Sequence, residues 1–430
     1  MKRGVFSTPL FHLPLSLVLC PLSLVLSHLV LSHLVPCMKI ALIGAGAAGC
    51  FCAINIKRRM PHAEVHIFER GSKPLAKVAI TGGGRCNLTN TFAQVGSLQQ
   101  VYPRGDKLMR RMLSRFSQHD AMRWFEEAGV RLTVQPDQCV FPQSQDAMEI
   151  VHTLLRLMQQ SGVELHLGAE VTHELLHDFD RVVVCTGSFP KSGVPAFLQP
   201  YGMEIKQPIP SLFTFTIPTV NKSLMGTVVT DAAVSLAGTK FRASGALLLT
   251  HWGMSGPAIL RLSSYAARHL ADAQYQAVLV VNWCGEQGEE TVRTHLTTLL
   301  SMNPQKTISN VWFPWLTQRH WQELLHRADV PPTQRCSAMN KSLLNRLVAV
   351  LTGDHYPVTG KSTYKEEFVT CGGVALSNIS SNTLESKTLP GLYFAGEVLD
   401  VDGITGGFNL QAAWSMGYVV AESIAGSEGK

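Results

Sequence analysis

The chain has 430 residues, of which 46% are hydrophobic and 16% are charged, so it can bury a large core and should hold two or three domains. This composition excludes a largely disordered chain, and the mild formal charge of +6 suits either an RNA or phosphate-bearing partner or an ordinary soluble enzyme. The ten cysteines are scattered without C-x-x-C pairs, which disfavours a disulfide framework and a zinc or iron–sulfur site. We therefore expect no metal, and a reducing cytoplasm is the simplest compartment.

The first 37 residues form an apolar, repetitive extension. Lys2 and Arg3 precede an apolar run from Phe11 to Val35, as in a signal peptide or a membrane anchor. The run lacks a small-residue cleavage site, and it repeats itself as PLSLVLC and PLSLVLS, then SHLVL and SHLVP. We favour a misassigned start, with the natural protein beginning at Met38; a real anchor and a secretion signal are the alternatives. A start at Met38 predicts a cytoplasmic protein without stable membrane association.

The next stretch predicts a dinucleotide site. It holds two apolar runs separated by a G-x-G-x-x-G turn and a helical pattern, and it ends in an acid: Ile40–Ile43, Gly44, Gly46, Gly49, Val65–Phe68 and Glu69. The first glycine permits the turn, the second lets backbone approach a pyrophosphate, and the third lets helix and strand pack closely. The helix N-terminus attracts phosphates, and Glu69 can accept hydrogen bonds from ribose hydroxyls. An ordinary βαβ unit is the alternative.

A second glycine-rich segment follows, from Pro74 to Phe92. The run Gly82–Gly84 weakens helix and strand alike, so it is expected where backbone passes close to a bulky ligand. Arg85 adds a planar cation suited to phosphate, and Asn87 adds a short hydrogen-bonding side chain. A polar surface loop is the alternative.

Two further segments complete the first part of the predicted nucleotide domain, residues 38–190. From Arg104 to Arg131 the pattern is helical and basic, and a solvated helix face is favoured over a nucleic-acid footprint. Asp146 to Gln160 reads as an amphipathic helix that covers the sheet. Arg181 to Val184 is a buried strand whose end, Thr186-Gly187, should pass beside the bound nucleotide; an ordinary sheet strand is the alternative.

The composition then shifts, which predicts an inserted domain. Residues 191–285 carry short β-branched runs separated by turns, typical of an antiparallel, barrel-like domain, and residues 286–365 carry helical patterns and a return strand. A helix is expected from Ala258 to His269, and His251 at its preceding turn is a candidate substrate contact, although a packed turn is at least as plausible.

Residues 366–430 return to the nucleotide domain. Leu392–Ala395 is a short buried strand, Gly396-Glu397 is its end, and a long helix begins at Asn409 after a glycine-rich turn. An acid at this strand end can accept from the hydroxyls of a ribityl chain, which a nicotinamide dinucleotide lacks. The helix N-terminus would stabilise a reduced, anionic flavin. Both features favour FAD as the resident dinucleotide.

The segments GAGAAG, KVAITGGGRCNLTN, THWGMSGPAIL and GLYFAGEVLDVDGITGGFNLQAAWSMG resemble the signature segments of the bacterial YhiN/BaiN-like NAD(P)/FAD-dependent flavoproteins, from Met38 to about Ser423. The resemblance implies an α/β fold, a glutathione-reductase-type FAD domain interrupted by a β-barrel-like domain with a helical subdomain. Cys185 and Ser188-Phe189 depart from the Ala-Thr-Gly-Gly run usual in the family. With the motifs above, the resemblance places FAD contacts at Gly44, Gly46, Ala48, Gly49, Glu69, Arg70, Lys77, Gly83, Gly84, Arg85, Cys86, Asn87, Thr186, Gly187, Gly396, Glu397, Asp402, Gly407, Asn409 and Leu410.

The resemblance also implies a class of reaction. Some members reduce conjugated C=C bonds in steroid-like bile acids, and the YhiN type is associated with dihydrouridine formation in large-subunit ribosomal RNA. We therefore expect an FAD-dependent oxidoreductase, reduced transiently by NADH or NADPH because the chain has no second G-x-G-x-x-G unit, that acts on ribosomal RNA or a small enone. Cys86, His251 and Cys371 are the candidate proton donors. A non-catalytic flavin-binding redox sensor and a flavin monooxygenase are the alternatives.

Overall fold

The computed structural model describes residue 1 and residues 37–189, 194–362 and 369–427. Nearly all of the apolar extension lies outside these described residues, so the predictions about it stay predictions. The described residues from Lys39 onward belong to one compact unit, which is the subject below. No helix among the described residues combines the length and the apolar character needed to cross a membrane.

A five-stranded parallel sheet carries the nucleotide-binding part. Its strand order is β17 (Leu392–Phe394), β7 (Arg181–Val184), β1 (Lys39–Ile43), β2 (Glu64–Glu69) and β6 (Glu164–Leu167). The apolar runs of the first three strands are almost wholly buried, as expected for strands covered on both faces. The C-terminal strand β17 pairs with β7, so a sheet begun at residue 39 is completed by residues 392–394.

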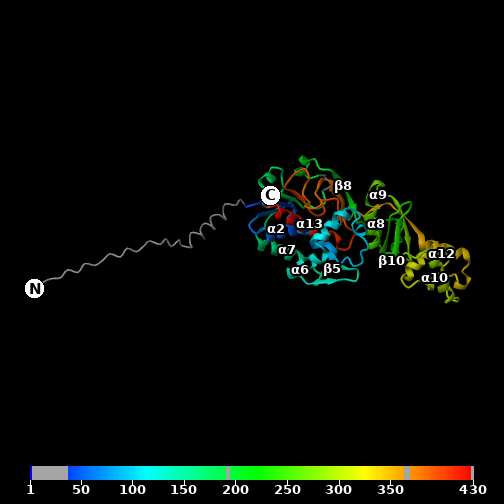
Figure 1. Ribbon diagram of the computed structural model, residues 1–430. Helices are drawn as coiled ribbons and strands as arrows, with labels where there is room; N and C mark the ends of the chain where they lie inside the picture. The colour runs from blue at the N-terminus through cyan, green and yellow to red at the C-terminus, as the bar shows by residue number, and fades with distance from the viewer. Residues whose placement is uncertain (2–36, 190–193, 363–368, 428–430) are drawn as a thin grey trace. The chain divides into compact units, whose positions relative to one another are not determined.

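Two helices from opposite ends of this unit pack together on the sheet. They are α2 (Ala47–Arg59) and α13 (Phe408–Ala425), blue and red in Figure 1. Gly417 permits the contact, because a Cβ there would lie 2.9 Å from the Ala48 carbonyl oxygen. The rings of Phe51 and Trp414 meet across the interface, 5.2 Å between centroids. The helix α7 (Ala147–Ser161), close to its predicted bounds, packs against α2.

A small layer of helices and strands lies in the chain between β2 and β6. It contains α3 (Ala76–Gly84), β3 (Thr89–Asn90), α4 (Leu98–Val101), α5 (Asp106–Arg115), α6 (Gln118–Glu127), β4 (Leu132–Val134) and β5 (Cys139–Pro142). The three strands form one antiparallel sheet in the order β3-β5-β4. Thr81, Gly82 and Gly83 have non-helical dihedral angles inside α3, so the predicted glycine segment is a turn there rather than helix.

The chain enters and leaves the inserted part through one antiparallel ribbon. Its strands are β8 (Ile205–Ser211) and β16 (Val369–Val374), paired from Val369 with Ser211 to Val374 with Ile205. We expected the segment of β16 to return directly to the nucleotide domain. It pairs instead with β8, from the inserted residues, and both glycines of β16 have positive φ angles of 103° and 122°.

The inserted part is built on a curled antiparallel sheet. Its order is β14 (Asp354–Val358), β13 (Ala277–Asn282), β10 (Val228–Leu236), β11 (Arg242–Leu249), β12 (Gly253–Ser255), β9 (Phe215–Thr216) and β15 (Gly360–Lys361). The two edge strands, β14 and β15, are separated by Thr359 alone, so the edges must approach each other as in a barrel. The predicted helix from Ala258 to His269 is two helices, α8 (Pro257–Tyr265) and α9 (Ala267–Asp272), which break at Ala266.

Three helices complete the inserted part: α10 (Glu289–Ser301), α11 (Gln318–Arg327) and α12 (Lys341–Gly353). Trp321 is fully buried there and donates to the carbonyl of Ile308 at 2.8 Å, and Trp315 donates to that of Trp283 at 3.1 Å. These tryptophans therefore belong to a core. The predicted fold class, an α/β Rossmann-type fold interrupted by an antiparallel, barrel-like part with helices, is confirmed.

Candidate active site

The first glycine turn has the three separate uses that its spacing predicts. Gly44 has a φ of 108°, and a Cβ there would lie 2.4 Å from the carbonyl oxygen of Cys185. A Cβ on Gly49 would lie 2.0 Å from the carbonyl oxygen of Gly44, so this glycine lets α2 pack against the turn. A Cβ on Gly46 would meet no atom within 4 Å. Gly46 is thus dispensable for packing and faces open space.

That open space belongs to a cavity of about 420 Å³ at the carboxyl ends of β1, β7 and β17. Ligands of open parallel sheets bind at this edge. The structure brings most of the predicted cofactor-binding residues to its wall: Gly44, Gly46, Ala48, Glu69, Lys77, Asn87, Thr186, Gly187, Gly396, Glu397, Gly407, Asn409 and Leu410.

The polar groups at one end of the cavity suit a diphosphate and a ribose. Glu69 accepts from the backbone N–H of Ala45 at 2.9 Å and of Gly71 at 2.7 Å, which fixes its carboxylate beside the turn. Neither α2 nor α13 carries an acid in its first turn, so the partial positive charge of each N-terminus remains available to an anion.

A second carboxylate, that of Glu397, lies at the end of β17. It accepts from the backbone N–H of Thr370 at 2.9 Å and pairs with the ammonium of Lys77 at 3.1 Å. The two acids, Glu69 and Glu397, therefore line the same cavity from two strand ends, as a dinucleotide with two polyhydroxylated parts requires.

The turn before α13 is fixed from several directions. The amide of Asn409 makes two hydrogen bonds to Gly403, both 2.8 Å, and Asn87 accepts from the N–H of Gly407 at 3.2 Å when its amide is oriented to donate to Thr89. Gly407 has a φ of 88°, and a Cβ there would lie 2.4 Å from the Thr89 carbonyl oxygen. Residues 87–89 and 403–409 are thus held together around the N-terminus of α13.

Several residues predicted to contact the cofactor do not line the cavity, because each is used or placed differently. Gly49 is used in packing, Arg70 is exposed beyond Glu69, and Cys86 is buried under the turn with its N–H donated to Thr81. Gly83 and Gly84 follow the cavity-lining Gly82, and Arg85 lies over the ring of Phe141 at 4.5 Å in a neighbouring cleft.

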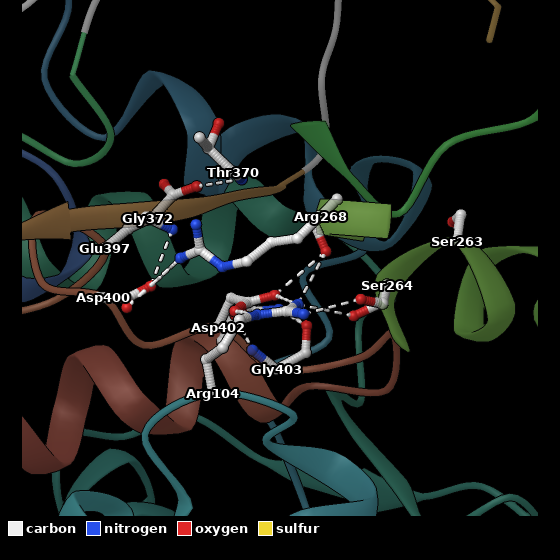
Figure 2. Close-up of polar contacts among 12 residues, drawn as sticks. Arg104, Ser263, Ser264, Arg268, Thr370, Gly372, Glu397, Asp400, Asp402 and Gly403 are labelled. Atoms are coloured by element: carbon white, nitrogen blue, oxygen red, sulfur yellow. Dashed lines mark hydrogen bonds and ion pairs between the residues drawn. The ribbon is translucent and has the colours of Figure 1, made fainter. Parts of the chain in front are cut away.

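Asp402 also lies off the cavity wall, because it is engaged by Arg104. Figure 2 shows the guanidinium of Arg104 between the carboxylate of Asp402 and Ser264 of α8, whose carbonyl accepts at 2.9 Å. Burial raises the pKa of the Asp402 carboxyl, and Arg104 and Ser211 oppose that rise. Arg104, predicted to lie in a solvated basic stretch, is therefore a half-buried partner of this acid.

A second ion pair involves an acid two residues earlier in the chain. Asp400 pairs with Arg268 of α9 at 3.1 Å and accepts from the N–H of Gly372 at 3.0 Å (Figure 2). Asp400 is thus tied to the inserted part directly by Arg268, and Asp402 is tied to it through Arg104 and its hydrogen bond to Ser264. These contacts fix the segment after Glu397 relative to the inserted part.

None of the three predicted proton donors lines the cavity. Cys86 and Cys371 are fully buried, and burial raises the thiol pKa to about 12 and about 11 respectively. His251 is exposed against the ring of Trp252, 3.6 Å between centroids. The structure does not bring these three residues to one place.

A larger cleft of about 980 Å³ adjoins the cavity and shares Gly82, Asn87 and Gly406 with it. The nucleotide domain supplies the loop after α3 and the segment around β5, and the inserted part supplies β11 and α8. Sequence reasoning missed the following lining residues, which belong to no local motif and come together only in the fold: Gln100, Gln135, Cys139, Arg242, Arg261 and Tyr265.

The chain is similar to known proteins over most of its length. The chain is 28% identical over 408 residues to the ribosomal RNA dihydrouridine synthase of Escherichia coli, a match that covers 89% of this chain and 97% of that protein. It is 26% identical over 409 residues to the 3-dehydro-bile acid delta(4,6)-reductase of Clostridium scindens, covering 90% and 99%. The 3-ketosteroid delta1-dehydrogenase structure from Sterolibacterium denitrificans gives a TM-score of 0.45 at 12% identity over 90% of this chain and 99% of that one.

The names of the two relatives agree with the predicted class of an oxidoreductase. The Rossmann domain of the HI0933-like proteins matches residues 38–423, which include both glycine turns, the inserted part and α13. The chain therefore belongs to the HI0933-like Rossmann family.

Proposed function

We propose that the cavity holds FAD and that the adjoining cleft holds a uridine of ribosomal RNA, which the enzyme reduces to dihydrouridine. The single observation that carries this proposal is the shared wall: a cavity with two carboxylates and two helix N-termini opens into a cleft lined by arginines and amides. A bound reduced flavin supplies a hydride to an activated C=C bond.

The residues that would hold FAD follow from the walls of the cavity. Gly46 leaves room for the diphosphate, Glu69 accepts from ribose hydroxyls, and Glu397 accepts from the ribityl chain. The N-terminus of α13 favours negative charge near its first turn. NADH or NADPH would bind transiently beside the flavin as the reductant.

The lining of the cleft supports a nucleic-acid substrate over an apolar enone. Three guanidinium groups line it, those of Arg85, Arg242 and Arg261, against two acids, Asp137 and Glu286, and much of the remaining lining is amide and hydroxyl. Arginines neutralise phosphates and amides hydrogen-bond to base edges, whereas a steroid-like ligand needs mainly apolar walls. An RNA substrate also accords with the cytoplasmic location predicted above.

The cleft also contains a proton donor. After hydride addition to one carbon of the C=C bond, the neighbouring carbon must receive a proton. Cys139 lines the cleft, and burial raises the pKa of its thiol to about 11, so Sγ carries its proton at neutral pH. Asn90 lies 3.9 Å away as a weak donor to Sγ. Tyr265, whose hydroxyl donates to the Gln100 carbonyl at 2.8 Å, is the second candidate proton donor in the cleft.

The test is mass mapping of dihydrouridine in ribosomal RNA from a strain that lacks the gene, with the full chain and a chain starting at Met38 as complementing copies. We expect one modification to disappear and to return with an active copy. Replacement of Arg242 by Ala should reduce the recovery, whereas replacement of the exposed Arg131, outside the cleft, should not.

An unchanged modification pattern would contradict an RNA substrate. If the purified flavoprotein then consumed NAD(P)H with a steroid-like enone, the second candidate, a small-molecule C=C reductase, would stand; the Clostridium scindens relative favours that candidate. If neither nicotinamide reduced the flavin at a useful rate, the protein would be a redox sensor.

A further inference from the structure

We propose a second site, for a divalent zinc-like ion, on the edge of the parallel sheet. Three side chains with metal-binding atoms meet there: His66 of β2 and Glu164 and His166 of β6. The proposal is independent of the reaction proposed above. The cysteine spacing, which disfavoured a zinc site, carries no information about ligands of this kind.

Strand register explains why the three side chains meet. In the parallel pair, His66 lies opposite Glu164, and Phe68 lies opposite His166. Residues two apart on a strand point to the same face, so both residues of β6 point to the face that carries His66. The strand β6 is the edge of the sheet, which leaves this face open to solvent on one side.

The distances between the three ligand atoms suit a single ion. Nδ1 of His66 lies 3.1 Å from Nε2 of His166 and 3.4 Å from Oε2 of Glu164, and the third side of the triangle is 4.0 Å. With zinc–ligand bonds of about 2.0–2.2 Å, neighbouring ligands of a tetrahedral site lie about 3.3–3.6 Å apart. Small rotations of Glu164, whose side chain is exposed, are enough to close the triangle.

The chemistry of the three side chains also favours a bound cation. Two imidazole nitrogens that face each other can share one proton when both rings are neutral, but they repel each other when both are protonated. A cation satisfies both nitrogens and the carboxylate at once. Imidazole with one carboxylate suits zinc, copper or nickel and not magnesium or calcium. The nearby acid Glu64 is already paired with Lys39 at 3.6 Å, which leaves Glu164 for the ion.

The ligands are held in place before any ion arrives. The ring of His166 stacks on Phe68 with 4.8 Å between centroids, and Phe179 packs edge-on against His66 at 5.4 Å. The exposed fractions of the side chains are 17% for His66 and 40% for His166, so an ion can reach them from solvent. A bound ion would fasten the edge strand β6 to β2, three residues before Glu69 at the nucleotide cavity.

The test uses the full chain, purified without a histidine tag, loaded with FAD and dialysed against a chelator. Calorimetric titration with zinc chloride should show saturable binding of one equivalent, unaffected by millimolar magnesium. Because loss of an outer-shell partner alone typically costs about 10–100-fold in affinity, His66→Gln or Glu164→Gln should weaken binding by about 100-fold or more. The control His152→Gln changes an exposed histidine of α7 and should bind as the wild type does.

Circular dichroism and flavin absorbance of each variant check that the fold is intact, and Glu164→Gln lies on an exposed edge where substitution is tolerated. No saturable binding by the wild type would overturn the proposal. Equal zinc binding by wild type, His66→Gln and Glu164→Gln would overturn it too, since the ion would then occupy another place.

Discussion

Replacement of two glycines of the first turn should separate nucleotide binding from folding. At Gly46 the backbone has φ −86° and ψ −168°, which alanine adopts readily, and the added methyl would meet no protein atom within 4 Å. At Gly49 the methyl would lie 2.0 Å from the carbonyl oxygen of Gly44, so the turn must open by about 1 Å to admit it.

The two substitutions therefore have opposite expected effects. Gly46→Ala should change the stability of the FAD-free protein by no more than about 0.5 kcal/mol, whereas Gly49→Ala should cost about 1–3 kcal/mol or more through overpacking. FAD at 100 times its Kd stabilises the wild type by about 2.7 kcal/mol. If the Gly46 methyl weakens binding about 100-fold, the same FAD concentration contributes only about 0.4 kcal/mol.

Two measurements check this prediction. Thermal unfolding of the FAD-free proteins, followed by circular dichroism, ranks their stabilities, and titration with FAD, followed by flavin fluorescence, gives the affinities. Wild-type FAD affinity in a well-folded Gly46→Ala protein would refute the placement of the diphosphate at this turn. A Gly49→Ala protein as stable as the wild type would refute the packing argument.

Three further predictions concern other parts of the molecule. Cys139→Ala should slow dihydrouridine formation by about 100-fold or more, while NAD(P)H still reduces the flavin at the wild-type rate. Stopped-flow absorbance measures the flavin reduction, and a slowed reduction would contradict the role of Cys139 as proton donor. Asp402→Ala leaves the guanidinium of Arg104 without its carboxylate partner and should lower the free energy of unfolding, measured with urea, by about 3–5 kcal/mol. Much of this loss should be recovered when Arg104→Met is added. Wild-type stability of the single variant would show the pair to be dispensable. Burial lowers the pKa of His320 from 6.5 to about 4, so on acidification the unfolded chain takes up the proton first. Between pH 7 and pH 5 the wild type should therefore lose about 2 kcal/mol of unfolding free energy relative to His320→Phe, and equal losses in the two proteins would contradict this.

The parts of the site that the sequence predicts are those whose function is set by neighbours in the chain. The spacing of Gly44, Gly46 and Gly49, and the acid that ends the second strand, are local consequences of a strand–turn–helix–strand unit. Glu397 was predicted for the same reason, because it ends a short apolar strand. Each of these residues lines the cavity or shapes its turn.

The remaining features depend on contacts between distant residues. Asp402 was assigned to the cofactor through the resemblance to a known family, but its partner Arg104 is 298 residues away and no local pattern indicates the pair. Cys139 and Arg242 meet at one cleft only because the nucleotide domain and the inserted part face each other there. The pairing of His66 with Glu164 needs the register of two strands that are about one hundred residues apart.

The ribbon of β8 and β16 has an evolutionary consequence. Because Ser211 and Val369 are direct partners across the ribbon, the two ends of the inserted segment lie side by side. A short turn could join them without disturbing the order of the parallel sheet, so the segment can be gained, lost or exchanged as a cassette. A shortened chain of this kind would retain the first glycine turn and both carboxylates but would lose β11 and α8, and with them one wall of the substrate cleft. Diversification of substrates within one scaffold would then require change in the cassette alone.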